Sequence, residues 1–330
     1  MPLDCALADN KKDCSGKQEL APEKTMTKTF YSNGKLLLTG EYVVLDGAKA
    51  LALPTIFGQN LVVENGKSRE IVWKSFDSDG SVWFEDVIAF DKIVDGKSEE
   101  EESVRNTLIA ILHQAYLVNP EFIENADGYS VTTNLTFPKI WGLGTSSTLI
   151  NNIAQWTNVD AFELLKNSFG GSGYDIASAQ NDVPIIYKLD DDKPVVEKAA
   201  FNPPFADQLY FVYLNRKQSS KTAIKSYYDN RRYGLEKSIN TINQITKSII
   251  NVADVGTFAR LLEKHETIMS DLLEMETVKQ TFFPDFNGTV KSLGGWGGDF
   301  VLAVSKENPT AYFKEKGFAT VIPYREMILK

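Results

Sequence analysis

A glycine-rich turn is the segment of this sequence best suited to bind an anion. From Gly142 to Ser147 it reads Gly-Leu-Gly-Thr-Ser-Ser, between an expected strand and an expected helix. Glycines let backbone N–H groups approach a phosphate at the positive end of a helix. The adjacent hydroxyls of Thr145 and Ser146 could bind phosphate oxygens or a magnesium ion that bridges them. A plain strand-to-helix turn with a Ser/Thr cap is the alternative, and the turn lacks the Gly-Lys-Ser/Thr of a Walker A loop.

Charged residues in two other segments could act on such a phosphate. Lys35 lies six residues before Glu41 in a segment that is otherwise apolar and framed by glycines. A lysine in an apolar strand needs an anionic partner, and the alternative is an edge strand from which Lys35 points to solvent. Asp175 follows the glycine-rich residues 170–173 and precedes an apolar stretch. It could be a helix N-cap, or a base and metal partner.

Two further segments are candidates for contact with a ligand. Residues 294–298 read Gly-Gly-Trp-Gly-Gly just before an expected strand, which suits close backbone approach to a ligand or to another loop. A flexible connection is the alternative. Residues 215–222 carry three cations between an expected strand and an expected helix, and with Lys139 they are best placed to bind a phosphate acceptor. A solvated helix start explains residues 215–222 equally well.

The charge balance argues against some classes of partner. The 330-residue chain has 35 Lys and Arg residues against 44 Asp and Glu residues, which gives a net charge of −9. This charge repels nucleic acid and anionic membranes, so we expect a small-molecule substrate that meets locally placed donors. No stretch approaches the roughly 18–20 consecutive apolar residues of a membrane span, and no apolar signal segment follows the N-terminus. We therefore expect a cytoplasmic protein.

Cysteines and histidines add no candidate site. Both cysteines, Cys5 and Cys14, fall in the first 14 residues, which excludes a disulfide framework or a thiolate zinc site in the folded body. The two histidines, His113 and His265, each lie in a stretch with helical spacing. A histidine-dependent mechanism is therefore not expected.

The apolar pattern predicts the elements that must position these residues. Strands are expected over residues 29–38, 40–53 with a turn at Asp46-Gly47, 61–64, 70–76, 81–90, 129–135, 209–214, 300–304 and 319–323, and helices from 104 on and over 147–156, 160–169, about 219–253 and 257–274. The first strands are expected to form an antiparallel hairpin and its antiparallel extension. Strands mixed with segregated helices indicate an α+β chain. We expect a flexible extension over residues 1–25, an N-terminal domain over 26–200 and a C-terminal domain over 201–330.

In this order, the segments resemble the motifs of the GHMP kinases, which are ATP-dependent small-molecule kinases. The resemblance rests on residues 34–41, on Pro138 with residues 142–147, and on residues 294–298. Within this superfamily the chain is most similar to the phosphomevalonate kinases, in residues 40–45, 171–177 and 297–299. The resemblance implies a two-domain α+β fold. Its N-terminal mixed α/β domain would carry the phosphate-binding strand, loop and helix, and its C-terminal domain would be ferredoxin-like.

The resemblance also implies ATP and Mg²⁺ as cofactors and gives roles to individual residues. Lys35 would neutralise the transferring phosphoryl group, Asp175 would sit beside Lys35 and the acceptor, and Ser146 would contact magnesium. The ATP phosphates would be held by Pro138, Gly142, Leu143, Gly144, Thr145, Ser146 and Ser147, and the substrate by Glu41, Ser172, Lys217, Ser219, Ser220, Gly295 and Gly297. The chain departs from the family pattern at Asn33, where proline is usual, and at Trp296, where a small residue is usual. The metal-binding glutamate of mevalonate kinases also has no counterpart before Asp175.

The expected acceptor is phosphomevalonate, in the mevalonate pathway of isoprenoid precursor synthesis. A mevalonate kinase, or another GHMP kinase that phosphorylates a hydroxyl, is the alternative. A non-catalytic nucleotide-binding homologue is a second alternative, which the departures at Asn33 and Trp296 motivate. A hydroxyl acceptor must lose a proton and calls for a base, whereas a phosphate acceptor is already anionic near pH 7. We expect a monomer or a homodimer.

Overall fold

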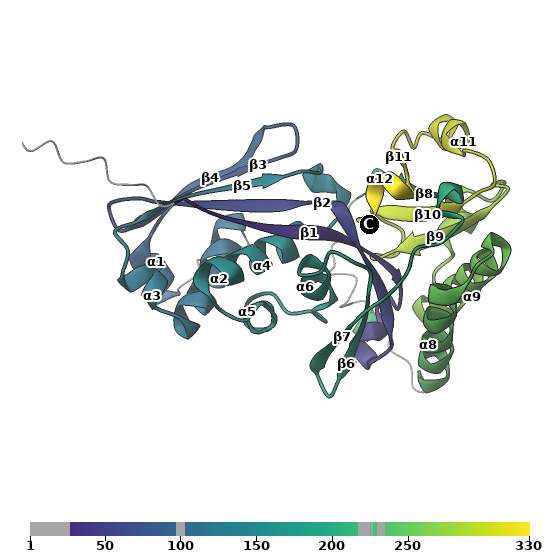
Figure 1. The fold of residues 1–330 in the computed structure, drawn as a ribbon, viewed down its shortest axis with the longest axis horizontal. Helices are drawn as coiled ribbons and strands as arrows, with labels where there is room; N and C mark the ends of the chain where they lie inside the picture. The colour runs from purple at the N-terminus through teal and green to yellow at the C-terminus, as the bar shows by residue number, and fades with distance from the viewer. Residues whose placement is uncertain (1–26, 97–102, 217–224, 226, 230–234) are drawn as a thin grey trace, which may run out of the picture.

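Two β-sheets organise the chain. The computed structural model describes residues 27–96, 103–216, 225, 227–229 and 235–330. Strands of the larger sheet all precede residue 199, and those of the smaller sheet all follow residue 208. Figure 1 shows most of the larger sheet on the left and the smaller sheet on the right. The expected extension over residues 1–25 lies outside the described residues.

The larger sheet has the strand order β4-β3-β5-β2-β6-β7, and β1 pairs with β2. Its strands are β1 (Lys28–Thr39), β2 (Ala50–Asn65), β3 (Glu70–Phe76), β4 (Val82–Ala89), β5 (Tyr129–Leu135), β6 (Ile185–Asp190) and β7 (Lys193–Lys198). The expected antiparallel extension is wrong at one place, because β5 lies between β2 and β3 and runs parallel to β3. A parallel pair needs a long crossover, and the helices between β4 and β5 are part of it.

The opening hairpin is longer than expected. Residues 40–53 and 61–64, predicted as separate strands, belong partly to one continuous strand, β2. The chain between β1 and β2 forms a short 3-10 turn, η1 (Val43–Asp46), instead of continuing as a strand. Gly47 ends this turn with a φ of 81°, in the left-handed region that glycine tolerates, so the expected turn at Asp46-Gly47 is confirmed.

A bulge in β1 precedes Lys35. The register between β1 and β2 shifts between Asn33 and Lys35, and Gly34 lies at this shift. A Cβ on Gly34 would stand 2.7 Å from Thr55 Oγ1 and 3.0 Å from the carbonyl oxygen of Leu143. Only glycine therefore lets β1 approach these two segments so closely.

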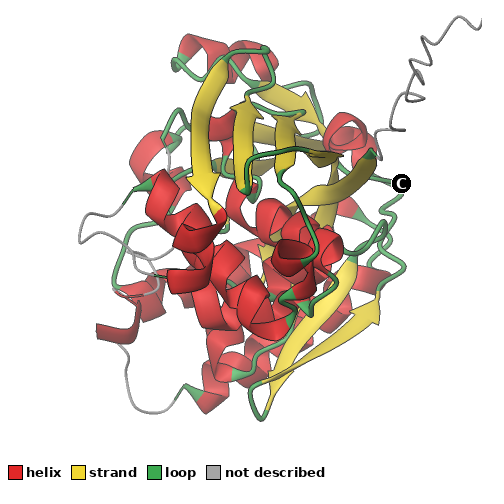
Figure 2. Ribbon diagram, turned by 90° about the vertical axis from the view of Figure 1, so that its left-hand side faces the viewer, coloured by secondary structure: helices red, strands yellow, loops and turns green. Residues whose placement is uncertain are grey.

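Helices cover one face of the larger sheet, as Figures 1 and 2 show. They are α1 (Phe90–Asp95), α2 (Val104–Val118), α3 (Glu121–Glu124), α4 (Thr145–Thr157), α5 (Ala161–Ser168) and α6 (Tyr174–Ala179), with the 3-10 turn η2 (Lys139–Trp141) before α4. The alternation in β3 explains this arrangement: Ile71 and Trp73 are buried against the helices, whereas Val72 on the other face is 43% exposed. The helices expected from residues 104, 147 and 160 are confirmed, although α4 begins two residues early.

The smaller sheet is antiparallel, with the strand order β11-β8-β10-β9. Its strands are β8 (Leu209–Tyr213), β9 (Thr289–Leu293), β10 (Phe300–Val304) and β11 (Val321–Pro323), and the helical elements of this half are η3 (Ala206–Gln208), α8 (Glu236–Asn251), α9 (Val255–Leu273), α10 (Val278–Phe282), α11 (Thr310–Glu315) and α12 (Tyr324–Met327). The strands expected over 209–214, 300–304 and 319–323 are confirmed. Strands β6, β7 and β9 were not expected. None of the helices in the described ranges is long and apolar enough to cross a membrane.

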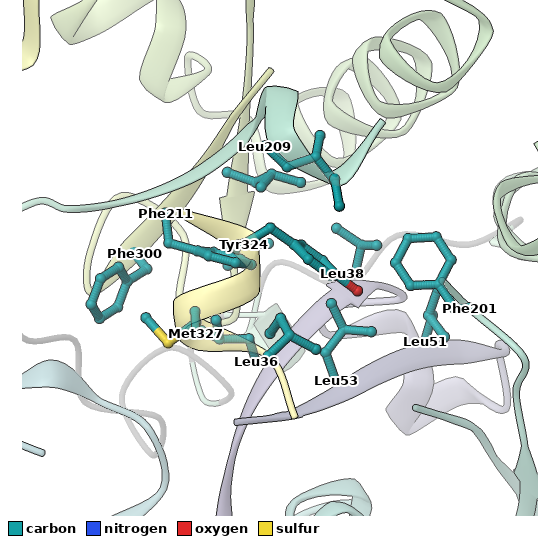
Figure 3. Close-up of a cluster of buried hydrophobic side chains, with 14 of the residues drawn as sticks. Leu36, Leu38, Leu51, Leu53, Phe201, Leu209, Phe211, Phe300, Tyr324 and Met327 are labelled. Carbon is teal, nitrogen blue, oxygen red and sulfur yellow. The ribbon is translucent and has the colours of Figure 1, made fainter. Parts of the chain in front are cut away.

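One hydrophobic core joins the two sheets. Figure 3 shows apolar side chains of β1 and β2 facing those of the C-terminal half, with Leu36, Leu38, Leu51 and Leu53 on one side and Leu209, Phe211, Phe300, Tyr324 and Met327 on the other. Complete burial of such a side chain stabilises the fold by roughly 1.5–3 kcal/mol. The division into two domains stays a prediction, but the observed mixture of helices and sheets agrees with the expected fold class.

Candidate functional site

The glycine-rich turn leads into α4 as expected. Its glycines have left-handed backbones, with a φ of 68° at Gly142 and 99° at Gly144, and Gly144 is the N-cap of α4. The backbone N–H of Lys35 donates to the carbonyl of Leu143 over 3.0 Å, which ties the turn to β1. The hydroxyl of Ser147 donates to the carbonyl of Gly144 over 2.9 Å. This hydroxyl therefore closes the turn internally.

The first turn of α4 presents two further hydroxyls. Thr145 is half-buried and Ser146 is exposed. Both lie at the positive end of a 13-residue helix, where the first backbone N–H groups have no acceptor within the helix. Before the turn, the carbonyl of Pro138 accepts a hydrogen bond from the N–H of Trp141 over 2.9 Å, which closes η2. This end of α4 has the chemistry of an anion-binding site.

Lys35 and Asp175 form an ion pair beside this turn. Lys35 Nζ lies 3.2 Å from Asp175 Oδ1, and the two side chains are 12% and 32% exposed. A Cβ on Gly144 would stand 3.4 Å from Lys35 Cε, so the lysine stem runs along the turn. Burial opposes the charged ammonium, but the charges of Asp175 and Asp299 raise the pKa of Lys35 above its usual value. Lys35 is therefore a fixed cation and does not point to solvent.

A tight entry into α6 positions Asp175. Gly173, with a φ of 88°, is the N-cap of α6, and Asp175 lies in the first turn instead of capping the helix. A Cβ on Gly173 would stand 3.0 Å from the Tyr187 hydroxyl and 3.1 Å from the ring of Phe162. The Tyr187 hydroxyl donates to the carbonyl of Ser172. Ser172, an expected substrate contact, is 9% exposed, and its backbone fixes this entry.

Asp299 brings a second carboxylate from the C-terminal half. A Cβ on Gly142 would collide with this carboxylate, so Asp299 lies directly against the glycine-rich turn. Its φ of 50° is unusual for a residue other than glycine. The backbone is held on both sides: its N–H donates to the carbonyl of Arg216 over 2.7 Å, and its carbonyl accepts from Leu214 over 2.8 Å. The site therefore combines residues from both halves of the chain.

The late glycine-rich loop, residues 294–298, is anchored by its tryptophan. Trp296 is 4% exposed and packs in a cluster with Val43 and Met269. Its indole Nε1 donates to the carbonyl of Glu276 over 3.2 Å. Its backbone N–H donates to the hydroxyl of Tyr42 over 2.9 Å. The departure from a small residue therefore places an aromatic ring in the core of the protein.

Gly295 and Gly297, both expected substrate contacts, lie in this loop. The carbonyl of Gly295 accepts from the N–H of Gly298 over 3.2 Å, so the loop forms a turn. Gly297 has a φ of 76°, which requires glycine or a strained residue.

Glu41, another expected substrate contact, lies in a buried ion cluster. Its carboxylate accepts from the ammonium of Lys291, which also lies 3.4 Å from Glu266 Oε2. His265 Nε2 is 3.3 Å from Glu41 Oε2 and accepts from the N–H of Gly40 over 3.0 Å. Burial raises the pKa of Glu41 to about 7, although Lys291 opposes this. Burial and Lys291 lower the pKa of His265, which is therefore neutral.

Asn33, the second departure from the family pattern, ties β1 to the end of α6. Its Nδ2 donates to the carbonyl of Asn181 over 3.0 Å and to Asp182 Oδ1 over 2.8 Å. Proline offers no side-chain donor, so these two bonds are specific to asparagine.

The expected basic groups are only partly described. Lys139 Nζ lies 4.4 Å from the ring centre of Trp83, and the guanidinium of Arg216 lies 4.9 Å from that of Phe282. These contacts are cation–π pairs. Lys217, Ser219, Ser220 and Lys221 lie outside the described residues.

Sequence reasoning missed Lys291 and the part played by Asp299. Lys291 is the only charged residue in the buried strand β9, and like Lys35 it has an anionic partner. Its neighbours Thr289 and Ser292 are polar, so the sequence of β9 lacks the apolar pattern that marked Lys35. For Asp299 the sequence offers only its place at the end of the Gly-Gly-Asp run, residues 297–299. Its contact with Gly142 depends on how the two halves meet.

The donors at the turn fit a magnesium ion carried by a nucleotide. In the part of the chain that the structure describes, no group of three His, Cys, Asp or Glu side chains could hold a metal ion. Nucleotide-bound Mg²⁺ needs only one or two protein ligands, because phosphates and waters supply the rest. The hydroxyl of Ser146 and the carboxylates of Asp175 and Asp299 are oxygen ligands of the required kind.

The fold is similar to those of solved small-molecule kinases. Methanococcus jannaschii mevalonate kinase matches with a TM-score of 0.64 and 16% identity, over 91% of this chain and 97% of that protein. Streptococcus pneumoniae phosphomevalonate kinase, in complex with phosphomevalonate and AMPPNP, matches with a TM-score of 0.62 and 16% identity, over 88% of this chain and 95% of that protein. Lactococcus lactis galactokinase, complexed with galactose, matches with a TM-score of 0.60 and 14% identity, over 88% of each chain.

Sequence comparison finds less. No protein-family model matches the chain, and no curated protein sequence matches it either. The similar TM-scores for mevalonate kinase and phosphomevalonate kinase do not separate the two acceptors. The expected fold is nevertheless confirmed: the chain has the GHMP kinase fold.

Proposed function

We propose that the protein is an ATP-dependent kinase that transfers the γ-phosphoryl group of ATP to phosphomevalonate, in isoprenoid precursor synthesis. The observation that carries this proposal is the ion pair of Lys35 and Asp175, 3.2 Å apart beside Gly144 of the phosphate-binding turn. Phosphoryl transfer is catalysed by positioning and charge neutralisation. A fixed cation next to the N-terminus of a helix supplies both.

Each part of the site then has a task. The turn from Gly142 to Ser147 holds the nucleotide phosphates through its backbone N–H groups. Ser146 would hold Mg²⁺ through its hydroxyl, and when bound the ion would neutralise phosphate charge. Lys35 donates hydrogen bonds to the phosphoryl group as it moves, and its raised pKa keeps it protonated throughout the physiological range.

The acceptor decides what Asp175 does. The phosphate of phosphomevalonate is already ionised and needs no base, so Asp175 acts by holding Lys35 in place. With mevalonate as the acceptor, Asp175 would instead accept the hydroxyl proton. Its 32% exposure leaves part of the carboxylate accessible for this second task. Mevalonate kinase activity is therefore the second candidate.

Purified protein should be incubated with ATP and Mg²⁺ and, separately, with phosphomevalonate, mevalonate, galactose and homoserine. ADP release with phosphomevalonate alone is the expected result. Release with mevalonate alone would overturn the assignment in favour of the second candidate. Nucleotide binding without turnover of any acceptor would favour a non-catalytic homologue.

A further inference from the structure

Tyr42 has a strained backbone close to the candidate site. Its φ is 59° and its ψ is −52°, which lies outside the regions that residues other than glycine normally occupy. A bulky residue stays in such a conformation only where its surroundings hold it, and strain of this kind gathers at functional sites. The proposed phosphoryl transfer assigns no role to Tyr42.

The C-terminal half fixes the chain immediately before Tyr42. The carboxylate of Glu41 accepts from the ammonium of Lys291 on β9. The N–H of Gly40 donates to the imidazole of His265 on α9 over 3.0 Å. Glu41, Lys291 and His265 are all buried. These bonds hold the backbone at Tyr42 without using its own side chain.

The strained backbone directs the Tyr42 hydroxyl to the loop 294–298. This hydroxyl accepts a hydrogen bond from the backbone N–H of Trp296 over 2.9 Å. Gly294 and Gly297 have φ values of 69° and 76°, and apart from their chain neighbours no described residue has an atom within 4 Å of a Cβ built on either of them. The loop backbone therefore depends strongly on its bond to Tyr42 and on the buried indole of Trp296.

The loop leads directly into Asp299. Only two glycines separate Trp296 from Asp299, whose carboxylate lies against Gly142 of the phosphate-binding turn. Burial and the charges of Glu41 and Asp299 raise the pKa of Tyr42, so its hydroxyl keeps its proton and lies within electrostatic reach of Asp299. The loop thus holds this carboxylate from one side, together with the backbone bonds of Asp299 to Arg216 and Leu214.

We propose that Tyr42 is a positioning residue for the phosphate-binding turn: its hydroxyl holds the loop 294–298, and with it Asp299, against Gly142. The inference rests on the proposed function, because its consequence is a phosphate-binding turn held in one conformation, which lowers the ordering cost of binding the nucleotide. Tyr42 acts through the loop and touches neither nucleotide nor acceptor in this role.

The test compares Tyr42→Phe with Tyr312→Phe. Each change removes one hydroxyl, and Tyr312 makes its hydrogen bond to Asp285 over 2.7 Å, outside the candidate site. Hydrogen exchange of the loop peptide and the KM for ATP should be measured for both variants and for the unchanged protein, together with kcat and the melting temperature.

Loss of one hydrogen bond should speed exchange in residues 294–298 of the Tyr42→Phe protein by about 3- to 10-fold. The KM for ATP should rise by a similar factor, with a smaller effect on kcat, and Tyr312→Phe should change neither quantity. Unchanged loop exchange in Tyr42→Phe, or faster exchange with an unchanged KM, would overturn the inference. If the unchanged protein binds no ATP, the proposed function fails, and loop exchange alone then decides whether Tyr42 holds the loop.

Discussion

The carboxylate of Asp299 lies directly against Gly142, although the first residue precedes β10 and the second precedes α4. A negative charge therefore stands at the turn that is best suited to bind phosphate. Lys35 is paired with Asp175, and the charge of Asp299 also raises the pKa of Lys35. One cation thus interacts with two carboxylates from opposite halves of the chain.

We expect Gly142→Ala to raise the KM for ATP by about tenfold or more. The methyl group would collide with the carboxylate of Asp299, and a φ of 68° costs an L-residue roughly 1–2 kcal/mol. Gly317→Ala is the matched control, because Gly317 has a φ of 90° but no described atom within 4 Å of its Cβ position. Equal kinetics for the two variants would contradict the contact with Asp299.

Lys35→Met should lower kcat by about 10²–10³-fold, because it removes the cation that stabilises the transferring phosphoryl group. Asp175→Asn should lower kcat as well, and the double variant should lose much less than the product of the two single losses, because the residues act as one pair. Steady-state kinetics measures all three. Lys316→Met, which removes an exposed lysine paired with Asp285 over 2.9 Å, is the control. Independent effects at Lys35 and Asp175 would argue against a shared task.

Glu41→Gln should change how stability depends on pH. The pKa of Glu41 is raised by burial from 4.5 to about 7, so between these values the folded protein holds a proton that the unfolded chain has released. The resulting stabilisation is complete below pH 4.5 and is lost as the pH rises through 7. The glutamine variant does not titrate at residue 41 and so loses no stability there in this window. Its melting temperature, relative to that of the unchanged protein, should therefore rise from pH 5 to pH 8.

The size of this gain is set by about 1.4 kcal/mol for each unit of pKa difference. His265 is present in both proteins, so the difference between them isolates residue 41. Parallel melting curves across the whole range would show that Glu41 keeps an ordinary pKa.

Asn152→Leu should destabilise the fold by about 2–4 kcal/mol, because it removes a buried acceptor from the Ser32 hydroxyl and a buried donor from the Gln59 carbonyl. Asn152 Oδ1 accepts from the hydroxyl of Ser32 over 2.7 Å, and its Nδ2 donates to the carbonyl of Gln59 over 2.9 Å. These bonds fix α4 on β1 and β2. Denaturant unfolding measures the effect, with the exposed Asn251→Leu as control, and a loss of less than about 0.5 kcal/mol would contradict it.

The apolar pattern predicted most of the strands that bury one or both faces, but it missed β6 and β9, and β9 is fully buried although three of its five residues are Thr, Lys and Ser. Residues 129–135 and 300–304 match β5 and β10 at both ends, because their hydrophobic residues carry the signal. In contrast, every residue of β7 is exposed, so its sequence shows no alternation of buried and exposed residues that could predict a strand. The parallel pairing of β3 with β5 depends on a crossover of many residues, and local sequence does not encode it.

In the candidate site, too, some residues could be predicted from local sequence and others depend on distant packing. Lys35 and Asp175 could be predicted because each is a charge in an apolar or glycine-rich segment, and the structure brings them together. Glu41 carried the same kind of signal, but its carboxylate turns into the core to meet Lys291. Which way a buried charge turns depends on the segment that packs against it, and here that segment lies far along the chain.

The 16 residues of β2 extend over roughly 50 Å at about 3.3 Å per residue. At one end Leu61 packs under the helices of the larger sheet, and at the other Leu53 packs against the C-terminal half. A hinge motion between the halves would have to break that shared packing. The two halves should therefore melt in a single cooperative transition, and adjustment to a bound substrate should be confined to the loops.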